Sequence, residues 1–202
     1  MKSIFSNQPK DLKNIFLDSI ELVGLNRPYF EIDNLSKKFI DSGQNLDLEW
    51  IQGLDCKNYL NDPLSIVNEQ KFKSILQKEI NESSEMLGKL MGCKKVLIRL
   101  STHRKPMCPR FHVDKIRCRL LITLYGDGTE WISNKDIDWK IFAKKSDSSE
   151  PIKKLGKVRK LKAGQWSLLK GGDWNTNFQG VVHRSPHGIG ERLLLSMDPI
   201  FN

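Results

Sequence analysis

The second half of the chain consists of short apolar segments separated by turn residues, and this pattern limits the folds open to it. Glycine-rich turns at 126–128 and 171–173, and a segment with proline and glycine at 186–190, punctuate the chain. The candidate strands after Cys93 are 96–100, 117–125, 130–132, 139–143, 165–169, 180–183 and 192–197. Many short strands at fairly regular spacing predict an antiparallel sandwich or barrel of about 110 residues.

The first 93 residues favour helices instead. Apolar residues recur at helical spacing in two short patterns, Leu12, Ile15, Phe16, Ile20 and Val23, then Leu35, Phe39 and Ile40. A longer pattern starts at Asp62, a candidate N-cap followed by Pro63, and stops at Gly92. The sequence therefore predicts an α+β chain, with a helical segment over residues 1–93 that packs on a β-module over residues 94–202 to form one compact unit.

Composition places the chain among ordinary globular proteins. Its 202 residues are 39% hydrophobic and 28% charged, and no apolar run is long enough to span a bilayer. We read no signal peptide at the N-terminus. The four cysteines form no CxxC pair, which favours free thiols in a reducing compartment. We therefore expect a cytoplasmic protein that makes no membrane contact.

The formal charge of +9 has two interpretations. Clustered Lys and Arg can replace counterions on nucleic-acid phosphates. Alternatively, the wealth of Lys, Asn and Ile reflects an AT-rich coding sequence, and the charge serves solubility. The densest basic stretch, 144–162, has the composition of a solvated loop. If it binds nucleic acid, the contacts fall on Lys153, Lys154, Lys157 and Lys160.

A possible metal site comes from three residues of the β-rich half. Side chains alternate faces in an extended segment, so His112 and Asp114 point the same way and can share one ion. His183 ends another candidate strand and supplies a third ligand. Two imidazoles and one carboxylate on one face of an octahedral ion leave the opposite face open, which is the facial triad of non-haem Fe(II) oxygenases.

Arg192 follows His183 by nine residues, at the start of the last candidate strand. A buried arginine at that position is costly without an anionic partner. Its planar fork of donors matches a carboxylate with two parallel hydrogen bonds. The sequence therefore predicts that Arg192 binds a carboxylate close to the metal.

This order of residues resembles the signature of the Fe(II)- and 2-oxoglutarate-dependent dioxygenases, which have the double-stranded β-helix (jelly-roll, cupin-like) fold. The resemblance covers about residues 95–199 and is nearest to the prolyl-hydroxylase-like branch. A Gly-x-Glu segment follows the HxD strand at Gly128–Glu130, and His183 is followed by Pro186 and Gly190-Glu191-Arg192. The resemblance implies an oxidoreductase that hydroxylates or demethylates a substrate.

A narrower resemblance covers most of the chain. The strings CPRFHVD at 108–114, GTEW at 128–131, LLKG at 168–171 and HRSP at 183–186 are similar to the uncharacterised bacterial family DUF1826. That family supplies no established reaction. Its association with zinc homeostasis makes zinc the alternative metal.

The resemblance to the dioxygenases also implies residue roles. His112, Asp114 and His183 would bind the metal and be catalytic, and Arg192 would bind the distal carboxylate of the co-substrate 2-oxoglutarate. Arg184 is an alternative anion binder. No Tyr or Asn clearly supplies the second co-substrate contact that this family has on the strand after HxD. Its candidates are the three residues that share one face of that strand, Arg119, Thr123 and Tyr125.

Three hypotheses remain open: an Fe(II)- and 2-oxoglutarate-dependent oxygenase, a zinc-binding jelly-roll protein of metal homeostasis, and a basic nucleic-acid-binding module. Cys108, four residues before His112, belongs to the zinc hypothesis as a thiolate ligand. His103 and His187 are expected in solvated loops. Core packing is expected for Trp131, Trp166 and Trp174, in preference to a substrate pocket.

Overall fold

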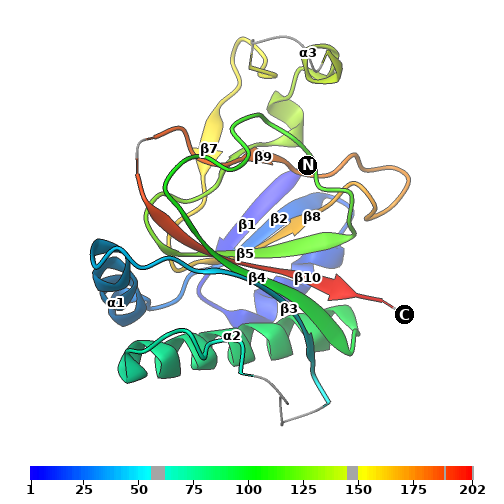
Figure 1. Cartoon of the computed structure of the whole chain (residues 1–202). Helices are drawn as coiled ribbons and strands as arrows, with labels where there is room; N and C mark the ends of the chain where they lie inside the picture. Colours follow the sequence, from blue (N-terminus) through cyan, green and yellow to red (C-terminus); the bar gives the residue numbers. More distant parts are fainter. Residues whose placement is uncertain (56–61, 145–149, 189, 202) are drawn as a thin grey trace.

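The chain forms a mixed α+β structure with one large sheet, one small sheet and few helices, as the α+β prediction requires (Figure 1). The computed structural model describes residues 1–55, 62–144, 150–188 and 190–201. Cys56 and residues 145–149 of the basic stretch therefore lie outside the described residues. No described helix is both long enough and apolar enough to cross a membrane.

The large sheet has the strand order β1-β2-β8-β5-β10-β4-β3. Only β1 and β2 run parallel; the other neighbours are antiparallel. The strands are β1 (Lys2–Ser6), β2 (Ile20–Leu25), β3 (Asp47–Gly53), β4 (Lys95–His103), β5 (Cys118–Tyr125), β8 (Trp166–Lys170) and β10 (Arg192–Ile200). The last strand lies between β5 and β4, so the C-terminal residues sit in the middle of the sheet.

The small sheet consists of β6 (Glu130–Ile132) between β7 (Val158–Lys160) and β9 (Val182–Arg184), with both pairings antiparallel. Figure 1 shows β7 and β9 above the large sheet and α2 below it. Helices therefore cover one face of the large sheet, and the small sheet lies on the other side.

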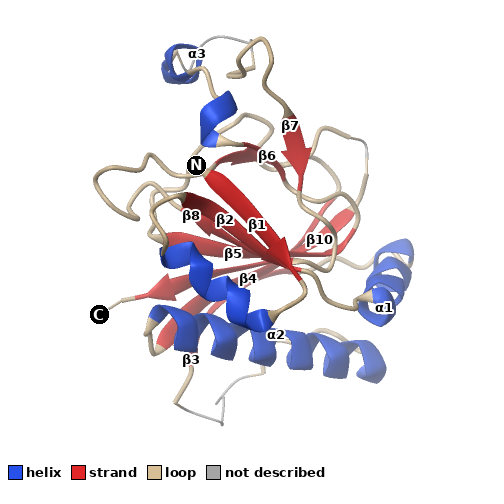
Figure 2. Cartoon of the chain, turned by 180° about the vertical axis from the view of Figure 1, so that it is seen from behind, coloured by secondary structure: helices blue, strands red, loops and turns tan. Residues whose placement is uncertain are grey.

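The helix α2 (Gln70–Met91) begins later than predicted. The side chain of Glu69, not Asp62, caps its N-terminus by accepting hydrogen bonds from the backbone N–H groups of Lys71 and Phe72. Its C-terminus is at Gly92, as predicted, where the left-handed φ of 69° suits glycine. Leu76 and Ile80 lie on the buried side of the helix, which crosses the sheet in Figure 2.

The prediction of a helical first half is wrong for the three strands β1, β2 and β3. The helix α1 (Phe30–Asp41) is present, but Ile20 and Val23 belong to β2, and η1 (Pro9–Phe16) is a 3₁₀ helix. Every residue of β2 is buried, Glu21 included, so its apolar residues do not alternate with exposed ones, and periodicity does not distinguish the strand from a buried helix. The large sheet thus takes strands from both sides of residue 93, and a domain boundary there stays a prediction.

The segment Trp139–Ala143, predicted as a strand, is the short helix α3. Asp138 explains the difference: its carboxylate accepts hydrogen bonds from the backbone N–H groups of Lys140 (3.0 Å) and Ile141 (3.2 Å). This N-cap favours a helix over the extended form. The strand β7 was not predicted at all.

The tryptophans pack in the core, as predicted. Trp131 and Trp166 are 1% and 5% exposed, and Trp174 is partly buried against both of the larger apolar clusters. The main cluster joins α1, α2 and one face of the large sheet. This packing fixes the sheet on which the candidate site is built.

Burial predicts that α2 is a main source of stability. Replacing Leu76, which is 0% exposed, by Ala should lower the free energy of unfolding by about 2–5 kcal/mol, since it leaves a cavity under the helix. The control is Lys78→Ala, because the Lys78 side chain is 75% exposed. Denaturant unfolding measures both; equal, small changes would contradict the predicted docking of α2.

Candidate metal centre

A short antiparallel bridge brings His112 and His183 together from segments far apart in the chain. The backbone N–H of each residue donates to the carbonyl of the other, at 2.9 Å in both directions. His183 lies on β9, and His112 lies in the connection between β4 and β5. The two rings are 4.5 Å apart between centroids, so their orientation is set by the backbone pairing.

Asp114 completes a cluster of three possible metal ligands. Its carboxylate lies 3.6 Å from Nε2 of His112 and 3.3 Å from Nε2 of His183. One ligand atom of each residue lies within 4.8 Å of those of the other two. The structure therefore brings together the three residues that the sequence predicted as ligands.

Backbone carbonyls hold both imidazoles in the form that can bind a metal. The Nδ1 atom of His112 lies 3.0 Å from the carbonyl oxygen of Arg110, and Nδ1 of His183 lies 3.0 Å from that of Val181. A carbonyl only accepts, so each Nδ1 carries the proton and donates. Nε2 of each ring then faces Asp114 and is the nitrogen available to a metal, an arrangement common among metal-binding histidines.

Glycines fix the backbone around Asp114. The N–H of Gly172 donates to the carbonyl of Asp114 at 2.8 Å, and that of Gly171 to the carbonyl of Arg117 at 2.8 Å. A Cβ at Gly171 would lie 2.0 Å from the carbonyl oxygen of Ile116, and one at Gly180 would lie 2.3 Å from the Val113 side chain. The 171–173 turn, predicted from sequence only as a separator, thus holds the HxD segment in place.

Arg119 is bound to carboxylates and is not free for a co-substrate. Its Nη1 donates to Asp114 at 2.7 Å, and its Nε and Nη2 donate to the two oxygens of Asp198, each at 2.7 Å. Arg99 binds the same Asp198 at 2.7 Å and Glu49 at 2.6 Å. A chain of alternating charges therefore runs from the candidate ligand Asp114 across β5, β10, β4 and β3 to the surface.

These neighbours shift the ionisation of the cluster. Burial acts to raise the pKa of Asp114, but the neighbouring imidazoles of His112 and His183, with the charge of Arg119, lower that pKa well below its usual range. The nearby carboxylate of Asp114 raises the pKa of His112, against the opposing effect of burial. Asp114 is therefore an anion at neutral pH and is available to a cation.

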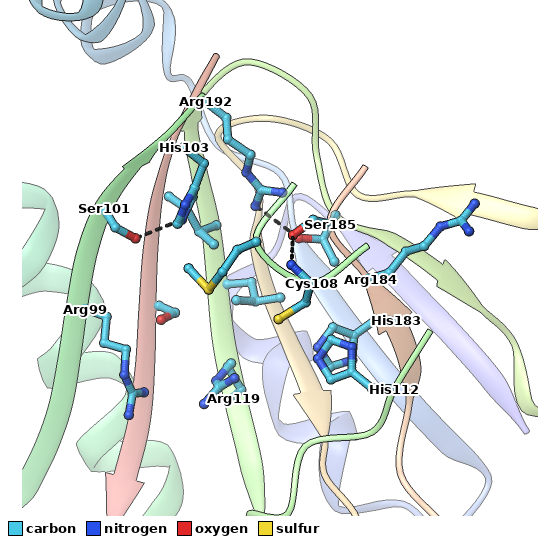
Figure 3. Close-up of a pocket in the computed structure, with 15 residues that line it drawn as sticks. Arg99, Ser101, His103, Cys108, His112, Arg119, His183, Arg184, Ser185 and Arg192 are labelled. Atoms are coloured by element: carbon cyan, nitrogen blue, oxygen red, sulfur yellow. Dashed lines mark hydrogen bonds between the residues drawn. The ribbon is translucent and has the colours of Figure 1, made fainter. Parts of the chain in front are cut away.

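A cavity of about 250 Å³ adjoins the cluster, and Arg192 projects into it (Figure 3). Arg192 is 4% exposed; its Nη2 donates to Thr129 at 3.2 Å, and its Nε has no partner. Burial lowers the pKa of Arg192 to about 10, so it remains a cation at neutral pH. An unpaired buried guanidinium is costly, which makes it a strong candidate for binding an anion in the cavity.

Arg184 points away from the cluster, because neighbouring residues of β9 face opposite sides (Figure 3). Its Nε pairs with Glu130 at 2.8 Å and its Nη2 with Glu150 at 2.7 Å. Thr123 and Tyr125 are not among the residues that line the cavity. Of the predicted co-substrate contacts, only Arg192 thus lies in the cavity without a carboxylate partner.

The remaining candidates divide differently from the prediction. His187 lies exposed in a loop, as expected. His103, also expected in a loop, ends β4 and lines the cavity, so that prediction is wrong. Cys108 lines the cavity too, but it does not belong to the cluster of possible ligands. The strand register that places His103 opposite Arg192 is not visible in the sequence.

In the basic stretch, two cations are already paired: Arg159 with Asp136 at 2.7 Å and Lys160 with Asp127 at 3.1 Å. Lys153 donates to the carbonyl of Lys135 at 2.8 Å. These side chains of the basic stretch are therefore engaged with other residues of the chain. A nucleic-acid interface in this stretch stays a prediction.

A family model described as "Protein of unknown function (DUF1826)" matches residues 6–198. No curated protein matches the chain. Solved structures do: the dioxygenase for auxin oxidation 1 of Arabidopsis thaliana, in a complex with 2-oxoglutarate, superposes with a TM-score of 0.63 and 11% identity, covering 100% of this chain and 93% of that one.

Two further structures have a similar fold. JOX2, solved with 2OG, Fe and JA, has a TM-score of 0.52 and 10% identity, covering 98% of this chain and 75% of that one. The dioxygenase for auxin oxidation of rice has a TM-score of 0.50 and 9% identity, covering 99% and 83%. The chain therefore shares the fold of dioxygenases, which agrees with the resemblance found in the sequence.

The geometry predicts one divalent-metal site per chain. His183→Gln should abolish Mn(II) or Zn(II) binding at that site, since two of three ligands bind weakly alone. The matched control His187→Gln changes an exposed histidine outside the cavity and should bind as the unaltered protein does. Calorimetric titration decides; a His183→Gln protein that retains the metal would refute the assignment.

The contact between Arg119 and Asp114 predicts a supporting role in metal binding. Arg119→Lys keeps the charge but cannot bridge both carboxylates, so metal affinity should fall about 10- to 100-fold. Arg117→Lys, at an exposed position two residues earlier, is the control. Affinity is measured by competition with a chelator, with circular dichroism to verify folding; unchanged affinity in a folded Arg119→Lys protein would contradict this role.

Proposed function

The chain belongs to the DUF1826 family, whose description names no reaction. From the site, we propose that the protein is an Fe(II)- and 2-oxoglutarate-dependent oxygenase. The observation that carries the proposal is the neighbourhood of two features in one cavity. One is the cluster of His112, Asp114 and His183, and the other is the buried, unpaired guanidinium of Arg192. A metal would explain the first feature, and an anionic ligand would explain the second.

The donor atoms of the cluster fit a divalent cation. Two imidazole nitrogens and a carboxylate oxygen, which are acceptors in the forms that bind metals, lie within 4.8 Å of one another, and Arg119 donates to Asp114 from one side. Such a set is unfavourable by itself and becomes favourable around a cation. Fe(II) in this site would supply the dioxygen chemistry that amino-acid side chains lack.

The overall reaction balances with 2-oxoglutarate as the source of two electrons. A substrate C–H bond, dioxygen and 2-oxoglutarate give a C–OH product, succinate and carbon dioxide. One oxygen atom enters the product and the other enters succinate. If the hydroxylated carbon is an N-methyl group, the product loses formaldehyde, so the same reaction demethylates.

Each residue has a defined task in this proposal. His112, Asp114 and His183 would hold the metal, which would supply a binding position for the keto-acid end of the co-substrate. Arg192 binds the distal carboxylate through its fork of donors, and Thr129 accepts from Nη2 and holds the guanidinium in the cavity. The burial of Arg192 strengthens this ion pair, because little water competes there.

The arrangement of the sheets supports the proposal. We propose that the large sheet and the small β7-β6-β9 sheet are the two halves of a distorted double-stranded β-helix, with the metal held where β9 meets the HxD segment. The dioxygenase of Arabidopsis thaliana was solved with 2-oxoglutarate, and JOX2 with 2OG and Fe. Ligands of the same kind fit the donors of this cavity.

Zinc is the alternative metal, since it accepts the same three donors. The zinc hypothesis with Cys108 as a ligand receives less support, because the cluster contains no sulfur. Zinc binding without any response to 2-oxoglutarate would favour that hypothesis over an oxygenase.

The test of the proposed function is spectroscopic. Anaerobic addition of Fe(II) and then 2-oxoglutarate should give a weak visible charge-transfer band. Arg192→Lys should lower the affinity for 2-oxoglutarate about 10- to 100-fold, because it removes the bidentate contact. The band should return at a high concentration of the co-substrate. Arg104→Lys, on a surface arginine paired with Glu191, is the control. No band at millimolar 2-oxoglutarate in the unaltered protein would reject the oxygenase.

A further inference from the structure

His103 and Arg192 form a pair of neighbouring side chains at one end of the cavity. The two residues lie directly opposite in the antiparallel register of β4 and β10, so their side chains share one face of the sheet. Both also line a smaller recess beside the cavity. Figure 3 shows both side chains entering the cavity from neighbouring strands.

The pair lacks an acidic partner. Among the described residues no carboxylate lies within ion-pair distance of Arg192, whose Nε is unpartnered. His103 bonds through Nε2 to Ser101 at 2.8 Å, and its Nδ1 makes no hydrogen bond to the rest of the described chain. Nε of Arg192 and Nδ1 of His103 are thus both free to hydrogen-bond a ligand in the same cavity.

The expected second contact for the co-substrate is missing elsewhere. Arg119 is bound to Asp114 and Asp198, while Thr123 and Tyr125 do not line the cavity. His103 lies beside Arg192, on the neighbouring strand β4, and lines the same cavity. It is therefore a candidate for the second co-substrate contact. Its position beside the guanidinium suits a carboxylate held between the two.

We propose that His103 and Arg192 together bind the distal carboxylate of 2-oxoglutarate, and that His103 takes up a proton when the co-substrate binds. This inference rests on the proposed function. It assigns to β4 a binding residue that makes co-substrate affinity depend on pH.

The electrostatics around His103 agree with this geometry. Burial and the positive charge of Arg192 lower the pKa of His103 below 6.5, so the ring is neutral in the free protein at pH 7. Asp47 on β3 acts in the opposite direction at longer range. A bound carboxylate compensates Arg192 and attracts a proton to the ring. The other charged groups near this end are Lys105 and Asp127 in the recess, Lys160 paired with Asp127, and the Arg104–Glu191 pair.

The sign of the pH effect follows from this proton. The complex binds one proton more than the free protein between the lowered pKa of free His103 and its raised pKa in the complex. Affinity for 2-oxoglutarate therefore rises as pH falls through that interval, by up to about tenfold per pH unit. Below the interval both states are protonated, and the dependence disappears.

The experiment is calorimetric titration of the Mn(II)-saturated protein with 2-oxoglutarate from pH 8.5 to 6, in buffers of different ionisation enthalpy. The unaltered protein should take up as much as one proton per ligand, depending on pH. His103→Gln should bind without that uptake and should lose the rise in affinity toward low pH. His187→Gln, the same change at an exposed histidine, should behave as the unaltered protein does. All three proteins keep the metal ligands. Any proton that those ligands take up or release is therefore the same in each titration and cancels in the comparison.

A second variant keeps the test decisive if glutamine disturbs the fold. His103→Lys replaces the ring by a permanent cation and should bind 2-oxoglutarate without proton uptake. Uptake by His103→Gln or His103→Lys equal to that of the unaltered protein would overturn the inference while leaving the oxygenase intact. If the unaltered protein binds no 2-oxoglutarate at any pH, the inference and the proposed function fail together.

Discussion

The pairing of His112 with His183 through two backbone hydrogen bonds is the constraint on which the site depends. It joins the connection after β4 to β9 and fixes both imidazoles before any ligand is present. Backbone carbonyls then accept a hydrogen bond from Nδ1 of each ring, so both Nε2 atoms face Asp114. Because backbone atoms set this geometry, the cluster is preorganised, and little ordering of side chains opposes metal binding.

The large sheet supports this cluster through charge as well as packing. Arg119 on β5 donates a hydrogen bond to the carboxylate of Asp114 and another to Asp198 on β10, which fixes its position. On the same face, β4 and β10 present His103 and Arg192 to the cavity. The candidate metal ligands and the proposed anion-binding end are therefore parts of one surface. Helix α2, on the opposite face, stabilises that surface without contributing a residue to the cavity.

Local sequence was enough to group the three candidate ligands and not enough to predict the residues around them. His112 and Asp114 could be paired because they are two residues apart in an extended segment, and Gly92 ended a helix as predicted. The pairing of Arg119 was not foreseen because its partner Asp198 lies 79 residues away. His103 was missed because its place beside Arg192 depends on strand register. The strand β2 read as helix because burial on both faces removes the alternation that identifies strands.

Anomalous diffraction from crystals loaded anaerobically with Fe(II) tests the central claim most directly. The account predicts one strong peak about 2.0–2.3 Å from Nε2 of His112, Nε2 of His183 and a carboxylate oxygen of Asp114, on the side that opens to the cavity. A peak that leaves out any of these three residues, or that includes the sulfur of Cys108, would contradict it.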